Sequence, residues 1–201
     1  MGAVYLALVH HPVLDKTGEI VTTAITNLDV HDIARSCRTY DLAGYFLVTP
    51  IDAQLALLDA ILGHWKPGAA GARRVPPRSE ALAIAKPARS LEEVLERITN
   101  AHGVAPHVVA TAARSTGVPL VSFADEAEAI ASREVPTLLL FGTGHGLAQS
   151  VLTNADALLR PVRPGGYNHL SVRAAVAIVL DRLFGDHRLS SPPVDGSGGE
   201  C

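Results

Sequence analysis

Three glycines within five positions form the segment of this sequence best suited to hold a ligand. Gly142, Gly144 and Gly146 follow an apolar run, so that residues 139–150 read LLFGTGHGLAQS. Because glycine lacks a Cβ, it adopts positive φ and lets a flat or bulky group come close to the backbone. The spacing is too short for the dinucleotide fingerprint G-x-G-x-x-G and stands far from the N-terminus. By itself the segment indicates either a ligand-binding loop or a tight turn.

A cationic group on one predicted helix is the second candidate for chemistry. His31, Arg35 and Arg38 are spaced to share a helix face. They indicate either a site that holds a nucleophile or a solvated face with paired arginines. Arginine holds its proton too tightly to act as a base, so Arg35 would serve as an anion holder or electrostatic partner. Asp29 is the nearest carboxylate in sequence that could accept a proton, although its role as helix N-cap is the favoured interpretation.

Arginines also gather in a segment rich in glycine and proline, KPGAAGARRVPPRS over 66–79. Arg73, Arg74 and Arg78 indicate either a patch that contacts phosphates or a solvated loop. His10 and His11 stand near Asp15, but no further ligand has a supporting spacing, so we expect no metal site.

Composition narrows the function classes. The formal net charge of −3 carries no global basic signature, so any contact with nucleic acid must come from a local patch. The two cysteines, Cys37 and Cys201, lie too far apart for a disulfide framework or a zinc site, which suits a reducing cytosol. The N-terminus lacks the features of a signal peptide, and no apolar run approaches membrane-spanning length. We therefore expect a soluble cytoplasmic protein without a membrane partner.

Short apolar runs alternate with helical patterns, and this alternation predicts an α/β fold with a mostly parallel sheet flanked by helices. We expect strands over 3–9, 44–50, 80–86, 107–111, 119–123, 137–142 and 157–162. We expect helices from about residue 29 and over 52–65, 90–103, 125–132, 146–155 and 171–185. Ser90 and Glu93 have capping-box spacing, and Gly103 ends that helix. Residues 1–185 form one domain in this interpretation, with 66–79 as an exposed loop and 186–201 as a disordered tail.

Three loops of small or polar residues follow the carboxyl ends of predicted strands, where ligands bind in folds of this class. They read AARSTG, GTGHGL and RPGGYNHLSV, and the last one runs into the C-terminal helix.

The order of these loops resembles the SPOUT superfamily of RNA methyltransferases, in particular its SpoU-like branch. There the motifs are T-x-A-R, F-G-x-E-x-x-G-L, I-P and S-L-N-V-S-V-A. An N-x-G-x-x-x-R helix precedes them, before a strand that ends in V-x-P. The matching positions in this sequence are Thr111 to Arg114, Phe141 to Leu147, Pro161, Asn168 to Ala174, the helix positions Asp29, His31 and Arg35, and Leu47 to Pro50.

The resemblance implies a deep trefoil knot in the C-terminal half, S-adenosylmethionine as cofactor and a homodimer through the helix 171–185. It implies an RNA substrate, with tRNA ahead of rRNA, methylated at a ribose 2′-hydroxyl or at guanine N1. Arg35 stands at the position that is catalytic in the family, and Asp29 is the second expected catalytic residue. Arg38, Arg73, Arg74 and Arg78 are the expected RNA contacts. The implied cofactor-binding residues are Thr111, Ala112, Arg114, Leu140, Phe141, Gly142, Thr143, Gly144, Gly146, Leu147, Pro161, Tyr167, Asn168, His169 and Leu170.

The sequence departs from the family pattern in ways that indicate a divergent branch. The glutamate of F-G-x-E is missing from a shortened turn that contains His145, and His169 replaces the asparagine of S-L-N. Two alternatives remain open: a SPOUT-fold protein that binds RNA or cofactor without catalysis, and an unrelated nucleotide-binding α/β protein. The latter would need a glycine loop after the first strand, which this sequence lacks.

Overall fold

A single parallel sheet organises the chain in the computed structural model, which describes residues 2–112, 120–163, 165, 167 and 169–185. The seven strands lie in the order β5-β4-β1-β8-β6-β9-β7, and all neighbours pair in parallel. The prediction of a mostly parallel α/β sheet flanked by helices is therefore confirmed. The strands of this sheet are β1 (Val4–Val9), β4 (Gly44–Val48), β5 (Ala85–Ala88), β6 (His107–Thr111), β7 (Leu120–Val121), β8 (Thr137–Gly142) and β9 (Ala157–Leu159).

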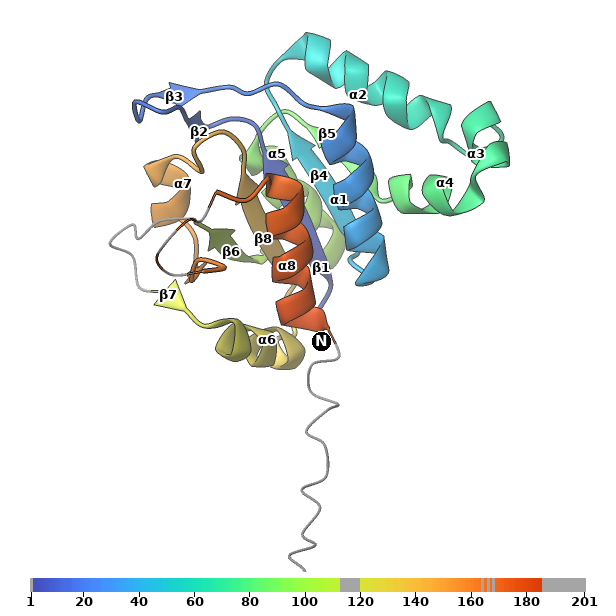
Figure 1. The fold of residues 1–201 in the computed structure, drawn as a ribbon. Coiled ribbons are helices and arrows are strands. Elements are labelled where there is room, and N and C mark those ends of the chain that lie inside the picture. Colours follow the sequence, from blue (N-terminus) through green and yellow to red (C-terminus); the bar gives the residue numbers. More distant parts are fainter. Residues whose placement is uncertain (1, 113–119, 164, 166, 168, 186–201) are drawn as a thin grey trace, which may run out of the picture.

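Helices cover both faces of the sheet (Figure 1). On one face α1 and α8 lie side by side, and α5 lies behind the sheet in the same view. The helices are α1 (Asn27–Thr39), α2 (Asp52–His64), α3 (Ala70–Arg74), α4 (Pro76–Leu82), α5 (Leu91–His102), α6 (Phe123–Ser132), α7 (Gln149–Thr153) and α8 (Val172–Phe184). None of these described helices is long and apolar enough to span a membrane.

The central strands are buried on both faces, because their side chains alternate between two apolar clusters. The cluster under α1 and α8 receives Leu6, Leu8, Tyr45, Leu47, Leu139 and Phe141. The cluster under α5 and α7 receives Ala7, Val9, Phe46, Val48, Leu138 and Leu140. Continuous apolar runs such as 3–9 were recognisable as strands for this reason.

The strand order turns at β1, which lies between β4 and β8. Val9 at the end of β1 pairs with Val48 on one side and Gly142 on the other. In open α/β sheets, ligands bind beyond the carboxyl ends of the strands where the order reverses. The glycine segment that follows β8 therefore begins at the point where a ligand site is expected.

The expected loop over 66–79 and the expected strand over 80–86 are wrong. Helices α3 and α4 occupy 70–82, and the strand begins only at Ala85. Two consecutive prolines open α4 in its first turn, where a missing N–H costs no hydrogen bond. The segment remains largely exposed, but it is helical and packs beside α1.

The long polar loop after the first strand contains an antiparallel hairpin, β2 (Val13–Leu14) and β3 (Ile20–Val21). Several predicted ends also move: β4 stops at 48, β9 at 159, and 123 begins a helix rather than ending a strand. The caps of α5 agree with the prediction. Ser90 accepts from the Glu93 N–H, and Gly103 is left-handed with φ 73°.

Candidate functional site

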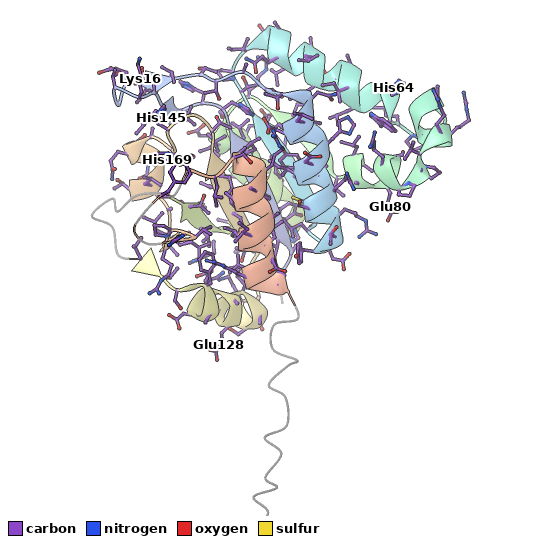
Figure 2. The ribbon with its side chains drawn as sticks, viewed as in Figure 1. Lys16, His64, Glu80, Glu128, His145 and His169 are labelled. Carbon is purple, nitrogen blue, oxygen red and sulfur yellow. The ribbon has the colours of Figure 1, made fainter. Side chains whose placement is uncertain are left out.

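A cleft of about 680 Å³ opens beyond the carboxyl ends of the strands. Ligand sites in proteins span about 300–1,000 Å³, so a nucleoside-sized molecule fits it. Its walls come from the ends of β6, β8 and β9, the start of α8 and the segment that enters α1. The predicted cofactor residues that line it are Thr111, Ala112, Phe141, Gly142, Thr143, Gly144, Gly146, His169 and Leu170. Figure 2 shows His145 and His169 on this side of the molecule.

The other predicted cofactor residues lie outside this lining. Leu140 is buried in β8, where its carbonyl accepts from the Thr111 hydroxyl at 2.9 Å. Leu147 is buried and forms a bridge to Val13. Pro161 stands between two lining residues, and the Tyr167 side chain is exposed. Arg114 and Asn168 lie outside the described residues.

Several residues that line the cleft were not predicted from the sequence. Some of them stand one or two positions before or after a predicted strand or helix, and this position is the signal that could have identified them. The missed lining residues are Thr23, Ala24, His145, Leu159, Arg160, Val162, Ser171, Val172, Ala175 and Val179.

The glycine segment is held against the β2–β3 hairpin. The His145 N–H donates to the Leu14 carbonyl, and the Leu14 N–H donates to the Gly146 carbonyl, both at 2.9 Å. A Cβ at Gly144, where φ is +59°, would stand 2.8 Å from the Leu14 carbonyl oxygen. The explanation that Gly144 leaves space for a ligand is therefore wrong, since the hairpin fills that space. At Gly146 an added Cβ would meet no atom within 4 Å, so the backbone there borders open space in the cleft wall.

A series of hydrogen bonds between polar side chains holds the glycine segment in place. The buried His10 shares a hydrogen bond with Thr23 at 3.0 Å between Nδ1 and Oγ1. Thr23 in turn bonds to Thr143, whose hydroxyl donates to the Val9 carbonyl. Within the described residues the buried Nε2 of His10 has no hydrogen-bond partner. These hydrogen bonds connect the glycine segment to the residues that lead into α1.

Asp29 joins α1 to α8 at the edge of the cleft. Its carboxylate accepts from Arg173 at 2.8 Å and from the Thr26 hydroxyl at 2.6 Å. The interpretation of Asp29 as the N-cap is wrong, because Thr26 caps α1 and accepts from the Asp29 N–H. Asp29 occupies the third helical position, and both its N–H and its carboxylate bond to the Thr26 hydroxyl. Among the described cleft-lining residues, Asp29 is the only carboxylate.

Arg35 does not face this cleft within a single chain. It lines a second hollow of about 470 Å³ between α1, the end of α2 and α4, together with His31, Trp65 and Arg78. Arg38 does not line it, since its guanidinium is held by Asp41 and Glu80, each at 2.6 Å. The predicted sharing of one surface by His31, Arg35 and Arg38 therefore holds only for the first two.

The two remaining arginines of the predicted RNA patch lie on α3. Arg73 donates to the Gly68 carbonyl at 2.7 Å, and Arg74 is exposed. No group of three histidine, cysteine or carboxylate side chains that could hold a metal ion occurs among the residues described.

The stability of the fold should fall at acidic pH because of His10. Burial lowers the pKa of His10 to about 4, while Asp29 and the backbone bond to Thr23 oppose the shift. The folded value lies below the unfolded value of about 6.5, so the unfolded chain binds more protons between them. The free energy of unfolding should thus drop by about 3 kcal/mol from pH 6.5 to pH 4.

Urea unfolding at several pH values measures this loss. His10→Gln should flatten the dependence within that window, whereas His64→Gln, at an exposed position on α2, should keep it. Equal slopes for the unchanged chain and His10→Gln would contradict the assignment.

The cleft combines apolar walls with the start of a helix. Phe141, Leu159 and Val162 offer surfaces for a flat ring. The first N–H groups of α8, which Ser171 caps, favour a negatively charged group nearby. Chemically, the cleft suits a nucleoside that also carries an anionic end.

Residues 3–185 match the profile of a family described as SAM-dependent RNA methyltransferase. The chain belongs to this family. It is 47% identical over 183 residues to a tRNA (guanine-N(1)-)-methyltransferase of Nitratidesulfovibrio vulgaris, a match that covers 90% of this chain and 42% of that protein. The chain thus spans less than half the length of this curated relative.

An uncharacterized protein of Aquifex aeolicus is similar over nearly its whole length. It is 40% identical over 186 residues, which cover 92% of this chain and 90% of that one. Among solved structures, the SpoU methyltransferase AviRb from Streptomyces viridochromogenes superposes with a TM-score of 0.57 at 17% identity, over 90% of this chain and 58% of that one. At this identity the likeness shows that the two chains share a fold. The prediction of a SAM-dependent RNA methyltransferase is confirmed by the family match.

The methyltransferase family implies S-adenosylmethionine as cofactor, and the cleft fits it. The open space at Gly146 lets a ligand lie against the backbone. The apolar side chains suit the adenine ring, and the start of α8 suits the carboxylate of the methionine part.

Proposed function

We propose that this chain transfers a methyl group from S-adenosylmethionine to tRNA. The observation that carries the proposal is the cleft itself, in which loops from three strand ends and the start of α8 line one nucleoside-sized space. The matching family uses this cofactor. The name of the Nitratidesulfovibrio relative supports tRNA as the substrate, and a tRNA substrate would place the protein in the cytoplasm.

The cofactor supplies a methyl group that is already activated on a sulfonium. We propose that Phe141, Gly146 and Leu170 bind it from the cleft wall, with Thr111 and His169 as polar neighbours. Leu140, Leu147 and Pro161 would support the wall from behind. Arg114, Tyr167 and Asn168 remain proposed contacts from the family motifs alone.

The protein must orient the acceptor in line with the methyl group and remove one proton. We propose Asp29 as the proton acceptor, since it is buried at the edge of the cleft. We propose Arg35 as the electrostatic partner of the reacting group. Because Arg35 lines the other hollow of its own chain, this role requires a second copy whose cleft it would face.

Two acceptor atoms are compatible with these observations. Guanine N1 is supported by the name of the relative, of which this chain matches 42%. The ribose 2′-hydroxyl is supported by the SpoU-like order of motifs. In either case a carbon–sulfur bond breaks, a carbon–nitrogen or carbon–oxygen bond forms, and the acceptor's proton leaves to the base.

Isotope transfer tests the proposal. The protein is incubated with methyl-labelled cofactor and tRNA from a strain that lacks its gene, and the RNA is digested to nucleosides. We expect label in one nucleoside, either 1-methylguanosine or a 2′-O-methylated residue. Calorimetry should show that S-adenosylmethionine and S-adenosylhomocysteine bind. Folded protein that binds neither would overturn the proposal, and binding without transfer would favour a catalytically silent RNA- or cofactor-binding protein.

We propose a homodimer through α8, together with the trefoil knot that the family resemblance implies. Val176, Val179 and Leu180 pack inward, whereas Ala177 is exposed and Ile178 only half-buried. Small apolar residues on an outer face allow a second helix to approach closely. Leu28 on the neighbouring α1 is a further exposed apolar residue, with 60% of it accessible.

Sedimentation at micromolar concentration should give about twice the 21.1 kDa chain mass. Ala177→Glu should yield monomers, because it places a charge in the helix contact. Ala60→Glu, at an exposed alanine of α2, should leave the dimer intact. An unchanged chain that sediments as a monomer while it methylates RNA would contradict the proposal.

A further inference from the structure

The second hollow combines a planar aromatic side chain with cations, and of its lining residues the proposed methyl transfer uses Arg35 alone. Its walls come from α1, the end of α2 and α4, and its volume is about 470 Å³. Figure 2 places His64 and Glu80 on this side of the molecule, across the fold from His145 and His169. The lining residues are Asn27, Leu28, His31, Asp32, Arg35, Ile61, His64, Trp65 and Arg78.

Trp65 is the centre of this hollow. The guanidinium of Arg78 lies 5.4 Å from the indole ring. His31 and His64 stand nearly perpendicular to the indole, at 81° and 85°, with centroids 5.5 and 5.2 Å away. Indole and guanidinium planes are the surfaces on which unpaired nucleobases stack.

The charges of the hollow suit a phosphate. Within the described part of the chain, neither Arg35 nor Arg78 forms an ion pair, whereas Arg38 just outside is held by two carboxylates. Among the lining residues that the structure describes, Asp32 is the only carboxylate, and its Oδ2 lies 3.5 Å from Arg173 Nε. Two guanidinium groups without carboxylate partners among the described residues therefore line the hollow and can bind an anion.

His31 adds a hydrogen-bonding group that its own chain does not use. Among the described residues its Nδ1 is buried and has no partner. Burial lowers the pKa of His31, and Arg78 and Arg35 act in the same direction against Asp32. A neutral imidazole both donates and accepts, so it can bond to the edge of a base.

We propose that this hollow binds one unpaired nucleotide of the RNA substrate. The base of this nucleotide stacks on Trp65 and Arg78, and its phosphate contacts Arg35 and Arg78. The edge of the base forms a hydrogen bond with His31. The proposal rests on the proposed function, because it assigns the nucleotide to the RNA that is methylated. It adds a substrate contact built by α4 and the end of α2, outside the cleft of the same chain.

Fluorescence tests the contact directly, because Trp65 is the only tryptophan of the chain. The protein is excited where tyrosine does not absorb and is titrated with tRNA that lacks the modification. We expect saturable quenching as a base stacks on the indole. Arg78→Gln should weaken the binding and lower the salt slope by about 0.7, the value for one phosphate contact to a single strand. Lys86→Gln, at an exposed cation outside the hollow, should match the unchanged chain.

Substitution of Trp65 separates stacking from packing. Trp65→Leu should weaken tRNA binding by about 5- to 100-fold, the range expected for one stacked base, while Trp65→Phe should retain most of the affinity. Circular dichroism must show both variants folded, since Trp65 also packs against the core. If Trp65→Phe and Trp65→Leu both bind tRNA with the same affinity as the unchanged chain, the assignment of base stacking to Trp65 is wrong.

The outcomes also distinguish this proposal from the proposed function. Methylation of tRNA without any change in Trp65 fluorescence would overturn the nucleotide site and leave the function standing. Saturable quenching by tRNA in a protein that transfers no methyl group would support the site and overturn the function. Quenching by free nucleoside monophosphates alone, and not by tRNA, would overturn the assignment to RNA.

Discussion

Arg35→Ala should methylate RNA on the order of 100-fold more slowly than the unchanged chain, at saturating RNA and cofactor. The substitution removes one positioned charge, and the loss of a single electrostatic group at a reacting centre has this scale. Affinity for S-adenosylmethionine should stay the same, because Arg35 lies outside the cleft of its own chain and its proposed role at a partner's cleft concerns the reacting group of the RNA. Calorimetry and single-turnover transfer measure the two quantities separately.

Arg38→Ala is the matched control for Arg35→Ala. Arg38 lies on the same helix, but Asp41 and Glu80 already hold its guanidinium. Its removal should change turnover at saturating RNA by less than a factor of about 3, since exposed ion pairs contribute little. A wild-type rate for Arg35→Ala would refute the catalytic assignment, and Asp29 would then become the first residue to test.

Gly144→Val should abolish cofactor binding. Two costs coincide at this position: a β-branched residue is strained at φ +59°, and its Cβ would stand 2.8 Å from the Leu14 carbonyl oxygen. The hairpin and the glycine segment would have to separate, which breaks the backbone bonds that position Gly146. We expect calorimetry to detect no S-adenosylmethionine binding at concentrations about 100-fold above the dissociation constant of the unchanged chain.

Gly103→Val supplies the control, because it carries the strain without the collision. Gly103 caps α5 at φ +73°, and a Cβ there would meet no atom within 4 Å. Its stability should fall by about 1–3 kcal/mol, the range for local backbone strain, with cofactor affinity unchanged. Equal cofactor affinities for the two valine variants would show that contact with the hairpin is unimportant.

The parts of the fold that follow local patterns were predictable from the sequence. Buried strands such as 3–9 read as continuous apolar runs, and α5 carried both of its cap signals at Ser90 and Gly103. The cleft was predictable in part, because many of its residues follow strand ends whose meeting point is fixed by parallel pairing. The motif order then selected the family.

The helices within residues 66–82 were not predicted, because glycine and proline usually interrupt helices. The two prolines stand instead at the first positions of α4, where they are tolerated. The helices gain stability from contacts distant in sequence: Leu82 is buried in the core, and Glu80 pairs with Arg38 of α1. Contacts between residues so far apart in the sequence leave no local sequence pattern. For the same reason the second hollow could not be predicted from the sequence.

The position of Asp29 in the cap of α1 was predicted wrongly although a local signal existed. Thr26 and Asp29 have the spacing of a reciprocal cap, and attention to Thr26 would have moved the start of α1. Its bond to Arg173 joins residues from opposite ends of the chain and was not predictable from spacing.

The position of β1 in the sheet has a consequence for synthesis on the ribosome. β1 pairs on one side with β4, which follows soon, and on the other with β8, whose residues 137–142 come much later. At about 5–20 residues per second, roughly 5–20 s pass between completion of β4 and arrival of β8. During that interval the centre of the final sheet is an unpaired edge, which is prone to join other chains. Substitutions that delay the docking of β8 should therefore reduce the yield of soluble protein before they alter any rate of methyl transfer.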